Sequence, residues 1–299
     1  MRGKLFTCKT IGMLAVLLVF FMAAGLAEET RTDGSGQWTY ILADGGATIV
    51  GYEDEPSGEL VIPGELDGYP VTGIGEYAFA CCEGLTSVII PDTVTEVGEY
   101  AFAECYSLTG MVISKGMTSI GDSAFAMCGI TSLTIPDSVT RIGYEAFEGC
   151  ADLTTVIISN SVTYIGDWAF SYCVALDNVV IPDSVTHIGD WAFSSCGALA
   201  DVIIPDSVTS IGEYAFASCE TLASAVIPDS VTFIGYEAFY ENNNIMLSVM
   251  KDSYAEQYAK GYHIPYVLIG GGMKLRRTRM MLPTMTWKPA YQARKRLKR

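Results

Sequence analysis

The chain has 299 residues, half of them hydrophobic, and a net charge of −16 at pH 7. Residues 28–270 hold all 34 Asp and Glu against five Lys and Arg, whereas residues 271–299 hold ten bases and no acid. An acidic body repels phosphate groups, which excludes nucleic acid as a partner.

Residues 1–27 have the features of a secretory signal peptide. Arg2, Lys4 and Lys9 precede an apolar run over residues 11–26, and small residues lie at its end. The run is short for a membrane span, and acidic sequence begins at Glu28. We therefore expect export, with no transmembrane segment in the mature chain. A retained N-terminal anchor is the alternative.

The segment over residues 28–71 precedes the regular part of the sequence. Residues 28–37 are polar and contain glycine, which indicates a linker. Residues 38–52 place β-favouring side chains on both sides of Asp44-Gly45-Gly46, a pattern typical of a hairpin. We expect residues 38–71 to form an N-terminal cap together with a stretched first repeat.

Residues 72–244 consist of a repeat of about 23 residues. An Ile-Gly or Val-Gly pair recurs eight times at intervals of 22 or 23 residues. Ala-Phe follows each pair, ending at Phe79, Phe102, Phe125, Phe147, Phe170, Phe193, Phe216 and Phe239. A fixed period in the twenties is the signature of a solenoid, in which stacked coils share one core.

Each copy of the repeat has three parts. L-x-x-V-x-I-P predicts a short strand that proline ends, and P-D-S/T predicts a turn. V-T-x-I-G then leads into D/E-x-A-F-x-x-C, which we interpret as a single helical or 3₁₀ turn with an acid at its N-terminal end. We expect the Leu, Val, Ile, Ala, Phe and Cys positions to point inward. At roughly 1.5–3 kcal/mol for each large buried side chain, stacked coils would hold a core that no single coil could form.

Seven of the nine cysteines form a column, each three residues after the repeat Phe: Cys82, Cys105, Cys128, Cys150, Cys173, Cys196 and Cys219. Neighbours in such a column would lie about 4.8 Å apart. A relaxed disulfide needs a Cβ separation of about 3.8 Å. We therefore expect buried free thiols that donate weakly to turn carbonyls, with Cys81 standing outside the column.

The C-terminal part of the chain departs from the repeat. Residues 252–260 predict a helix with Asp252 or Ser253 as its N-cap, and residues 264–269 predict a strand. We expect residues 245–270 to form a C-terminal cap. Residues 271–299 are basic and unpatterned, which favours disorder. Contact with an anionic surface, or with the acidic repeats, is the alternative for this tail.

The line L-x-x-V-x-I-P-D-S-V-T-x-I-G-x-x-A-F-x-x-C resembles the BspA-like, or Treponema-type, leucine-rich repeats over roughly residues 60–250. The resemblance implies an α/β-type repeat: a leucine-rich-repeat solenoid with a parallel concave β-sheet and short helices or turns on the convex side. It also implies exported surface proteins of host-associated microbes that are linked to adhesion and macromolecule binding. The family brings no catalytic residues.

Two outward columns are candidate partner-binding surfaces. In each predicted strand the residue between the inward Val and Ile points out, and the resulting strip is mostly β-branched and apolar: Ile89, Val112, Thr134, Ile157, Val180, Ile203 and Val226. The residue before Ala-Phe is often aromatic, as at Tyr77, Tyr100, Trp168, Trp191 and Tyr214. Such rings are enriched at binding hot spots. The alternatives are ordinary strand propensity for the strip and a purely stabilising ladder for the rings.

Other repeated residues have simpler explanations. The acids after proline and glycine lack the grouped spacing of a calcium loop, so we expect them to cap backbone N–H groups. The threonine of V-T-x-I-G predicts a structural hydroxyl ladder. His187 occupies a variable surface position, and no HExxH or Gly-x-Ser-x-Gly motif is present.

We therefore predict a non-enzymatic protein, secreted or displayed at the cell surface, without catalytic residues, cofactor or metal. It would bind a protein or glycan through the solenoid surface. The alternative is a structural spacer of the cell envelope with no specific ligand.

Overall fold

The computed structural model describes residues 29–270, so the expected signal peptide and basic tail lie outside the described residues. The described part begins with antiparallel strands β1 (Arg31–Thr32), β2 (Trp38–Ala43) and β3 (Gly46–Tyr52). Asp44 and Gly45 join β2 to β3 with positive φ angles of 49° and 83°. This turn chemistry matches the twist of the two strands and closes the hairpin.

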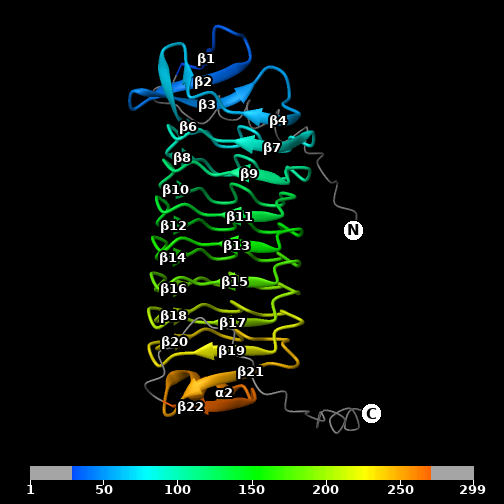
Figure 1. Ribbon diagram of the computed structural model, residues 1–299, viewed down its shortest axis with the longest axis vertical. Helices are drawn as coiled ribbons and strands as arrows, with labels where there is room; N and C mark the ends of the chain where they lie inside the picture. Colours follow the sequence, from blue (N-terminus) through cyan, green and yellow to red (C-terminus); the bar gives the residue numbers. More distant parts are fainter. Residues whose placement is uncertain (1–28, 271–299) are drawn as a thin grey trace. The chain divides into compact units, whose positions relative to one another are not determined.

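Stacked coils follow, and each contributes one strand to each of two columns of parallel strands (Figure 1). The first column continues the sheet of β3 into one long sheet. From β8 onward each of its strands has two residues, the second of which is the Ile or Val that precedes the repeat glycine. Its strands are β6 (Tyr69–Ile74), β8 (Glu96–Val97), β10 (Ser119–Ile120), β12 (Arg141–Ile142), β14 (Tyr164–Ile165), β16 (His187–Ile188), β18 (Ser210–Ile211) and β20 (Phe233–Ile234). β5 (Glu65–Leu66) pairs with β6. This sheet was not predicted, because strands of two residues are too short to show an alternating pattern.

The second column contains the predicted L-x-x-V-x-I strands, arranged as three successive parallel sheets. The first has β4 (Gly58–Val61), β7 (Leu85–Ile89) and β9 (Gly110–Val112). The second has β11 (Ser132–Thr134), β13 (Thr155–Ile157) and β15 (Asn178–Val180). The third has β17 (Asp201–Ile203), β19 (Ser224–Ile227), β21 (Met246–Met250) and β22 (Tyr266–Ile269). The predicted leucine-rich-repeat solenoid is confirmed.

The segment around Ala-Phe is a turn and not the helical or 3₁₀ turn that we predicted. The residue before Ala-Phe has a positive φ in every coil, for example 55° at Tyr77 and 60° at Trp168. A left-handed residue stops helix propagation. It persists here because alternate N–H groups donate to the next coil: Tyr77 to Glu99, Phe79 to Ala101 and Cys81 to Ala103, at 2.7–3.0 Å. We call this third set of contacts between coils the turn ladder.

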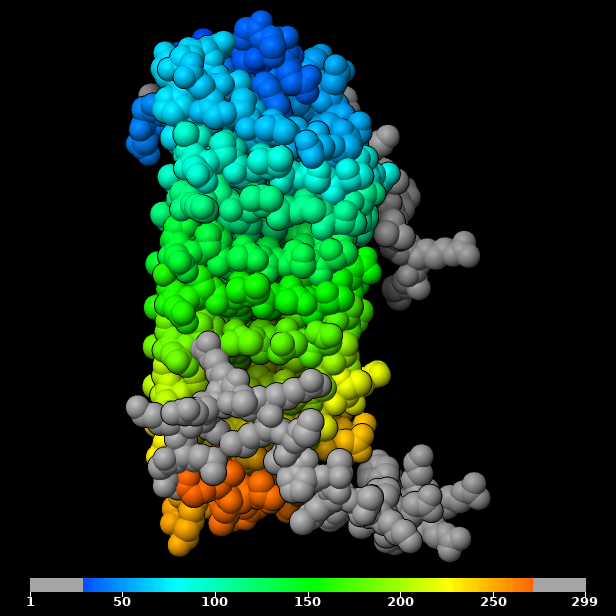
Figure 2. All heavy atoms as spheres, viewed as in Figure 1, coloured from blue at the N-terminus to red at the C-terminus, as the bar shows by residue number. Residues whose placement is uncertain are grey.

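The core is a continuous stack of the expected columns. The eight repeat phenylalanines are buried, and neighbouring rings stack with centroids 5.0–5.6 Å apart. All seven column cysteines are buried free thiols, as predicted. From Cys105 onward each donates to the carbonyl of the Phe 25 or 26 residues earlier, at 3.1–3.3 Å. Figure 2 shows the coils as successive bands in close contact.

Polar side chains also join coil to coil. The threonine hydroxyl of one coil donates to the threonine carbonyl of the previous coil, as from Thr186 to Thr163 at 3.1 Å, which confirms the hydroxyl ladder. Asp167 accepts from the Asp190 N–H at 2.9 Å, and Asp190 accepts from Glu213 at 2.7 Å. These acids therefore satisfy backbone donors of the next coil and not a helix N-terminus.

The last coil is covered by α2 (Tyr254–Gly261) and β22. Ser253 is the N-cap and accepts from the Glu256 N–H, while Glu256 accepts from the Asp252 N–H. The arrangement is a variant of the capping box in which the N3 carboxylate accepts from the residue before the N-cap and not from the N-cap itself. In the described part of the chain, no helix is both long and apolar enough to span a bilayer.

Candidate partner-binding surface

The outward residues of the second strand column lie in one line across successive coils, and we call this line the apolar strip. Strand register places Ile89 beside Val112, Ile157 beside Thr134 and Val180, and Ile203 beside Val226. Exposure is 60% at Val112 and 57% at Ile157, and between 40% and 46% at Ile89, Val180 and Ile203. Thr134 is exposed and Val226 half-buried.

The strip extends further toward the N-terminus than the repeat indicated. Val61 is the register partner of Ile89 and is 56% exposed. Val61 was not predicted as part of the strip, although it lies between Leu60 and Ile62 as each strip residue lies between its inward neighbours. The stretched loop after it hid the repeat.

The strip is uncharged over most of its length. The preceding outward position carries Ser87, Gly110, Ser132, Thr155, Asn178, Asp201 and Ser224. Asp201 is the single acid among these seven residues, and Glu59, the register partner of Ser87, is an exposed acid beside Val61. An acidic protein therefore presents a β-branched, largely neutral line, which is the kind of exposed apolar surface that marks a contact site.

The aromatic residues before Ala-Phe form two separate stacks. Tyr77 lies against Tyr100 at 4.9 Å, and Trp168, Trp191 and Tyr214 follow each other at 4.7 and 4.1 Å. Between the stacks Ser123 donates to Glu145 at 2.9 Å. Partial burial, and then the nearby Glu237 carboxylate, raise the pKa of Tyr214 to about 12, so its phenol stays protonated at neutral pH.

The geometry of these stacks limits what they can contact. All five rings are half-buried, and stacked pairs lie within 1–17° of parallel. Trp191, the inner ring of the longer stack, therefore has both faces covered and offers mainly its edge and its N–H group, and each of the other four rings has one face covered by its neighbour. A partner could hydrogen-bond to this edge, but it would find few free ring faces on which to stack.

The remaining candidates do not come together into a reaction centre. Within residues 29–270, no group of three or more His, Cys, Asp or Glu is arranged to hold a metal ion. His187 is exposed, and its Nδ1 lies 2.8 Å from the Thr186 hydroxyl. Burial raises the pKa of the Cys173 and Cys196 thiols well above the ordinary value, so they remain protonated and unreactive.

The strand columns, the phenylalanine stack and the thiol column together fit one known type of repeat. Residues 72–199 and 118–246 match the BspA type leucine rich repeat region, in six copies. The chain belongs to this BspA-type leucine-rich repeat family. The repeats of the family are typically interaction scaffolds and not enzymes. No curated protein is significantly similar to the chain.

Several solved structures resemble this BspA-type chain. A leucine-rich repeat protein from Bacteroides ovatus is 26% identical, with 76% of this chain and 71% of that chain covered and a TM-score of 0.49. A leucine rich cell surface protein from Faecalibacterium prausnitzii is 25% identical, covering 84% and 97%, with a TM-score of 0.41. The leucine-rich repeat protein of T. pallidum is 25% identical, covering 73% and 86%, with a TM-score of 0.34.

Proposed function

We propose that this chain is an exported bacterial surface protein that binds another macromolecule through the apolar strip and catalyses no reaction. Family membership supports an interaction role, and the similar protein of Faecalibacterium prausnitzii is described as a cell surface protein. The signal-like residues 1–27 support export. Adhesion is the role that we assign to this binding.

The exposed, register-matched line of Val and Ile side chains carries the proposal. Covering a half-exposed Val or Ile would contribute roughly 1 kcal/mol, so the five most exposed strip residues offer roughly 5 kcal/mol. Association costs about 4–15 kcal/mol in lost freedom of movement. A partner must therefore also use the Ser, Thr and Asn side chains beside the strip.

A protein partner fits this surface better than a glycan. The strip is a line of aliphatic side chains, and such a surface complements apolar side chains of another protein. A glycan is most readily held by open aromatic faces, and the rings of Trp168, Trp191 and Tyr214 cover one another. The edge of the aromatic stacks, Tyr77 and Tyr100 included, remains a second candidate surface.

Single lysine substitutions on the strip test the proposal. Ile157→Lys and Val180→Lys place a charge on exposed positions in the middle of the strip. The matched control is His187→Lys, which adds the same side chain at an exposed position of the long sheet. Binding to host matrix proteins and to neighbouring microbes is measured for each variant, together with the circular dichroism spectrum and thermal midpoint.

We expect the two strip variants to lose binding by at least tenfold while the control retains it and all three stay folded. Equal binding by all variants would refute the strip as the contact surface. Failure of the unaltered chain to bind any host or microbial macromolecule would favour the structural-spacer alternative.

A further inference from the structure

The turn ladder ends without a partner at the last coil. In seven consecutive coils, three alternate N–H groups donate to three carbonyls of the next coil, the last set from Tyr214, Phe216 and Ser218 to Tyr236, Ala238 and Tyr240 at 2.7–3.0 Å. The equivalent donors of the last coil are the N–H groups of Glu237, Phe239 and Glu241. Within the described residues, none of these three forms a hydrogen bond.

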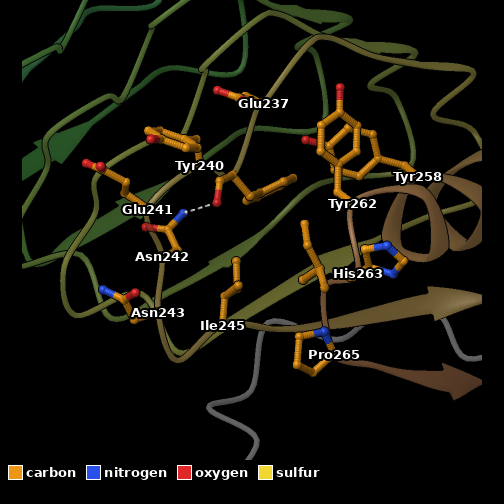
Figure 3. Close-up of a pocket in the computed structure, with 12 residues that line it drawn as sticks. Glu237, Tyr240, Glu241, Asn242, Asn243, Ile245, Tyr258, Tyr262, His263 and Pro265 are labelled. Atoms are coloured by element: carbon orange, nitrogen blue, oxygen red, sulfur yellow. Dashed lines mark hydrogen bonds between the residues drawn. The ribbon is translucent and has the colours of Figure 1, made fainter. Parts of the chain in front are cut away.

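A pocket of about 400 Å³ lies where the ladder ends, between the last coil and α2. It is lined by the three donor residues and, across from them, by Tyr258, Tyr262 and His263 (Figure 3). A second hollow of about 350 Å³ shares Glu241 and Asn243 with it. The two hollows adjoin at these residues, and we call them together the groove.

Two buried polar atoms of this pocket also have no hydrogen-bond partner: Asn242 Oδ1 and the Tyr258 hydroxyl. Their residues are only 8% and 7% exposed. An unpartnered buried polar group is destabilising, so both atoms favour a ligand that would satisfy them. Burial raises the pKa of the Tyr258 hydroxyl, and the nearby backbone groups of Phe239 and Ala238 partly oppose this without forming a hydrogen bond to it.

Asn242 marks the site in the sequence as well. It occupies the position that holds cysteine in the seven preceding coils, and its Nδ2 donates to the Phe216 carbonyl at 2.7 Å, as a column thiol would. Its Nδ2 also donates to the Phe239 carbonyl at 3.1 Å. The amide oxygen is the addition that cysteine lacks: a buried acceptor without a donor.

From this arrangement we infer that the end of the turn ladder is a binding site for an extended peptide segment from another protein. Its backbone would add one further rung: carbonyls of alternate residues would accept from Glu237, Phe239 and Glu241, and a peptide N–H would donate to Asn242 Oδ1. The Tyr258 hydroxyl would turn to donate to the same backbone.

The spacing of the donors favours a peptide over other ligands. The N–H groups belong to alternate residues, and the seven coils before them show that backbone carbonyls of alternate residues match this spacing. A peptide also brings the N–H that the buried amide oxygen needs, and strand-like addition to an open ladder is an established way to bind peptides. Because Glu237 and Glu241 flank the groove, a segment with a basic side chain fits better than an acidic one.

The chain itself provides a probe. Residues 212–218, Gly-Glu-Tyr-Ala-Phe-Ala-Ser, supply the carbonyls of Glu213, Ala215 and Ala217 to the coil before them. The acetylated and amidated heptapeptide with Glu213→Lys is labelled with a fluorophore and titrated with the full chain, and its anisotropy is measured. Hydrogen exchange of the 237–241 amides then shows where it binds.

We expect saturable binding and slower exchange at Glu237, Phe239 and Glu241. Asn242→Cys restores the repeat residue, and the loss of one hydrogen bond should weaken binding about fivefold to tenfold. Tyr258→Phe should weaken it to a similar extent. His187→Lys, at an exposed position of the long sheet and outside the pocket, is the control and should bind the peptide as the unaltered chain does.

Absence of binding at millimolar peptide, or unchanged affinity in both Asn242→Cys and Tyr258→Phe, would overturn the inference. Slower exchange of the same amides with a neutral oligosaccharide, and not with the peptide, would reassign the site to a glycan. Weaker binding of the original acidic heptapeptide than of the Glu213→Lys form would support the predicted role of Glu237 and Glu241.

Discussion

Gly189→Ala should strongly destabilise the solenoid, because the glycine lets two coils approach closely. A Cβ at this position would lie 2.4 Å from Asp167 Oδ1, 2.6 Å from the Asp167 nitrogen and 2.7 Å from the Gly166 carbonyl carbon. Non-bonded carbon atoms pack at about 3.5–4.0 Å, so the two coils would have to separate locally by about 1 Å.

That separation would break two hydrogen bonds: Gly189 N–H to the Ile165 carbonyl at 3.0 Å and Asp190 N–H to Asp167 at 2.9 Å. Overpacking costs about 1–3 kcal/mol, and each hydrogen bond contributes about 1 kcal/mol. We therefore expect the free energy of unfolding to fall by about 3–5 kcal/mol. Urea denaturation followed by circular dichroism measures the change.

Gly197→Ala is the matched control within the same coil. Its Cβ would meet only the Val174 carbonyl oxygen, at 3.6 Å, and the position does not need a positive φ. Alanine there should leave the free energy of unfolding unchanged or raise it by about 0.4–1 kcal/mol, because alanine lowers the conformational entropy of the unfolded chain. If the two variants differ by less than 1 kcal/mol, close approach between coils is not the reason for the repeated glycine.

Two further predictions concern the core columns. Phe170→Ala removes a buried ring that stacks on Phe147 and on Phe193, with ring centroids 5.4 Å apart in both pairs. It should lower the free energy of unfolding by about 3–5 kcal/mol in the same urea assay. A loss below 1 kcal/mol would contradict the continuous stack. Burial raises the pKa of the Cys150 and Cys219 thiols to about 12 from an ordinary value of 9.0. Between about pH 9 and pH 12 the two thiols lose their protons in the unfolded chain but keep them in the folded protein. The free energy of unfolding should therefore be constant below about pH 9 and then fall by about 1.4 kcal/mol per pH unit for each thiol. Replacing both with alanine should reduce that slope, as measured by urea denaturation from pH 8 to 10.

The features that repeat along the sequence could be predicted. The inward Leu, Ile and Phe columns, the thiol column and the outward position of Ile157 each follow from alternation in one strand or from the 23-residue period. The same position in every coil meets the same neighbours, so one correct assignment holds for all copies.

The features that depend on contacts between coils could not be predicted. Trp168 and Tyr214 have left-handed backbone conformations that local preference disfavours, and backbone hydrogen bonds to the next coil hold them there. The two-residue strands of the long sheet exist only through pairing with their neighbours. Val61 and Asn242 lie where the repeat begins and ends, so the repeat pattern gave no indication of their surroundings.

Neighbouring repeats meet through the long sheet and the turn ladder at every junction, and through the second strand column within each of its three sheets. A complete copy could therefore be duplicated or deleted without creating a new kind of junction, provided that the hairpin at one end and α2 at the other are kept. Each duplication would lengthen the apolar strip by one side chain, or about 4.8 Å. The number of copies thus sets the span of partner surface that the protein can cover, in steps of fixed size and unchanged chemistry.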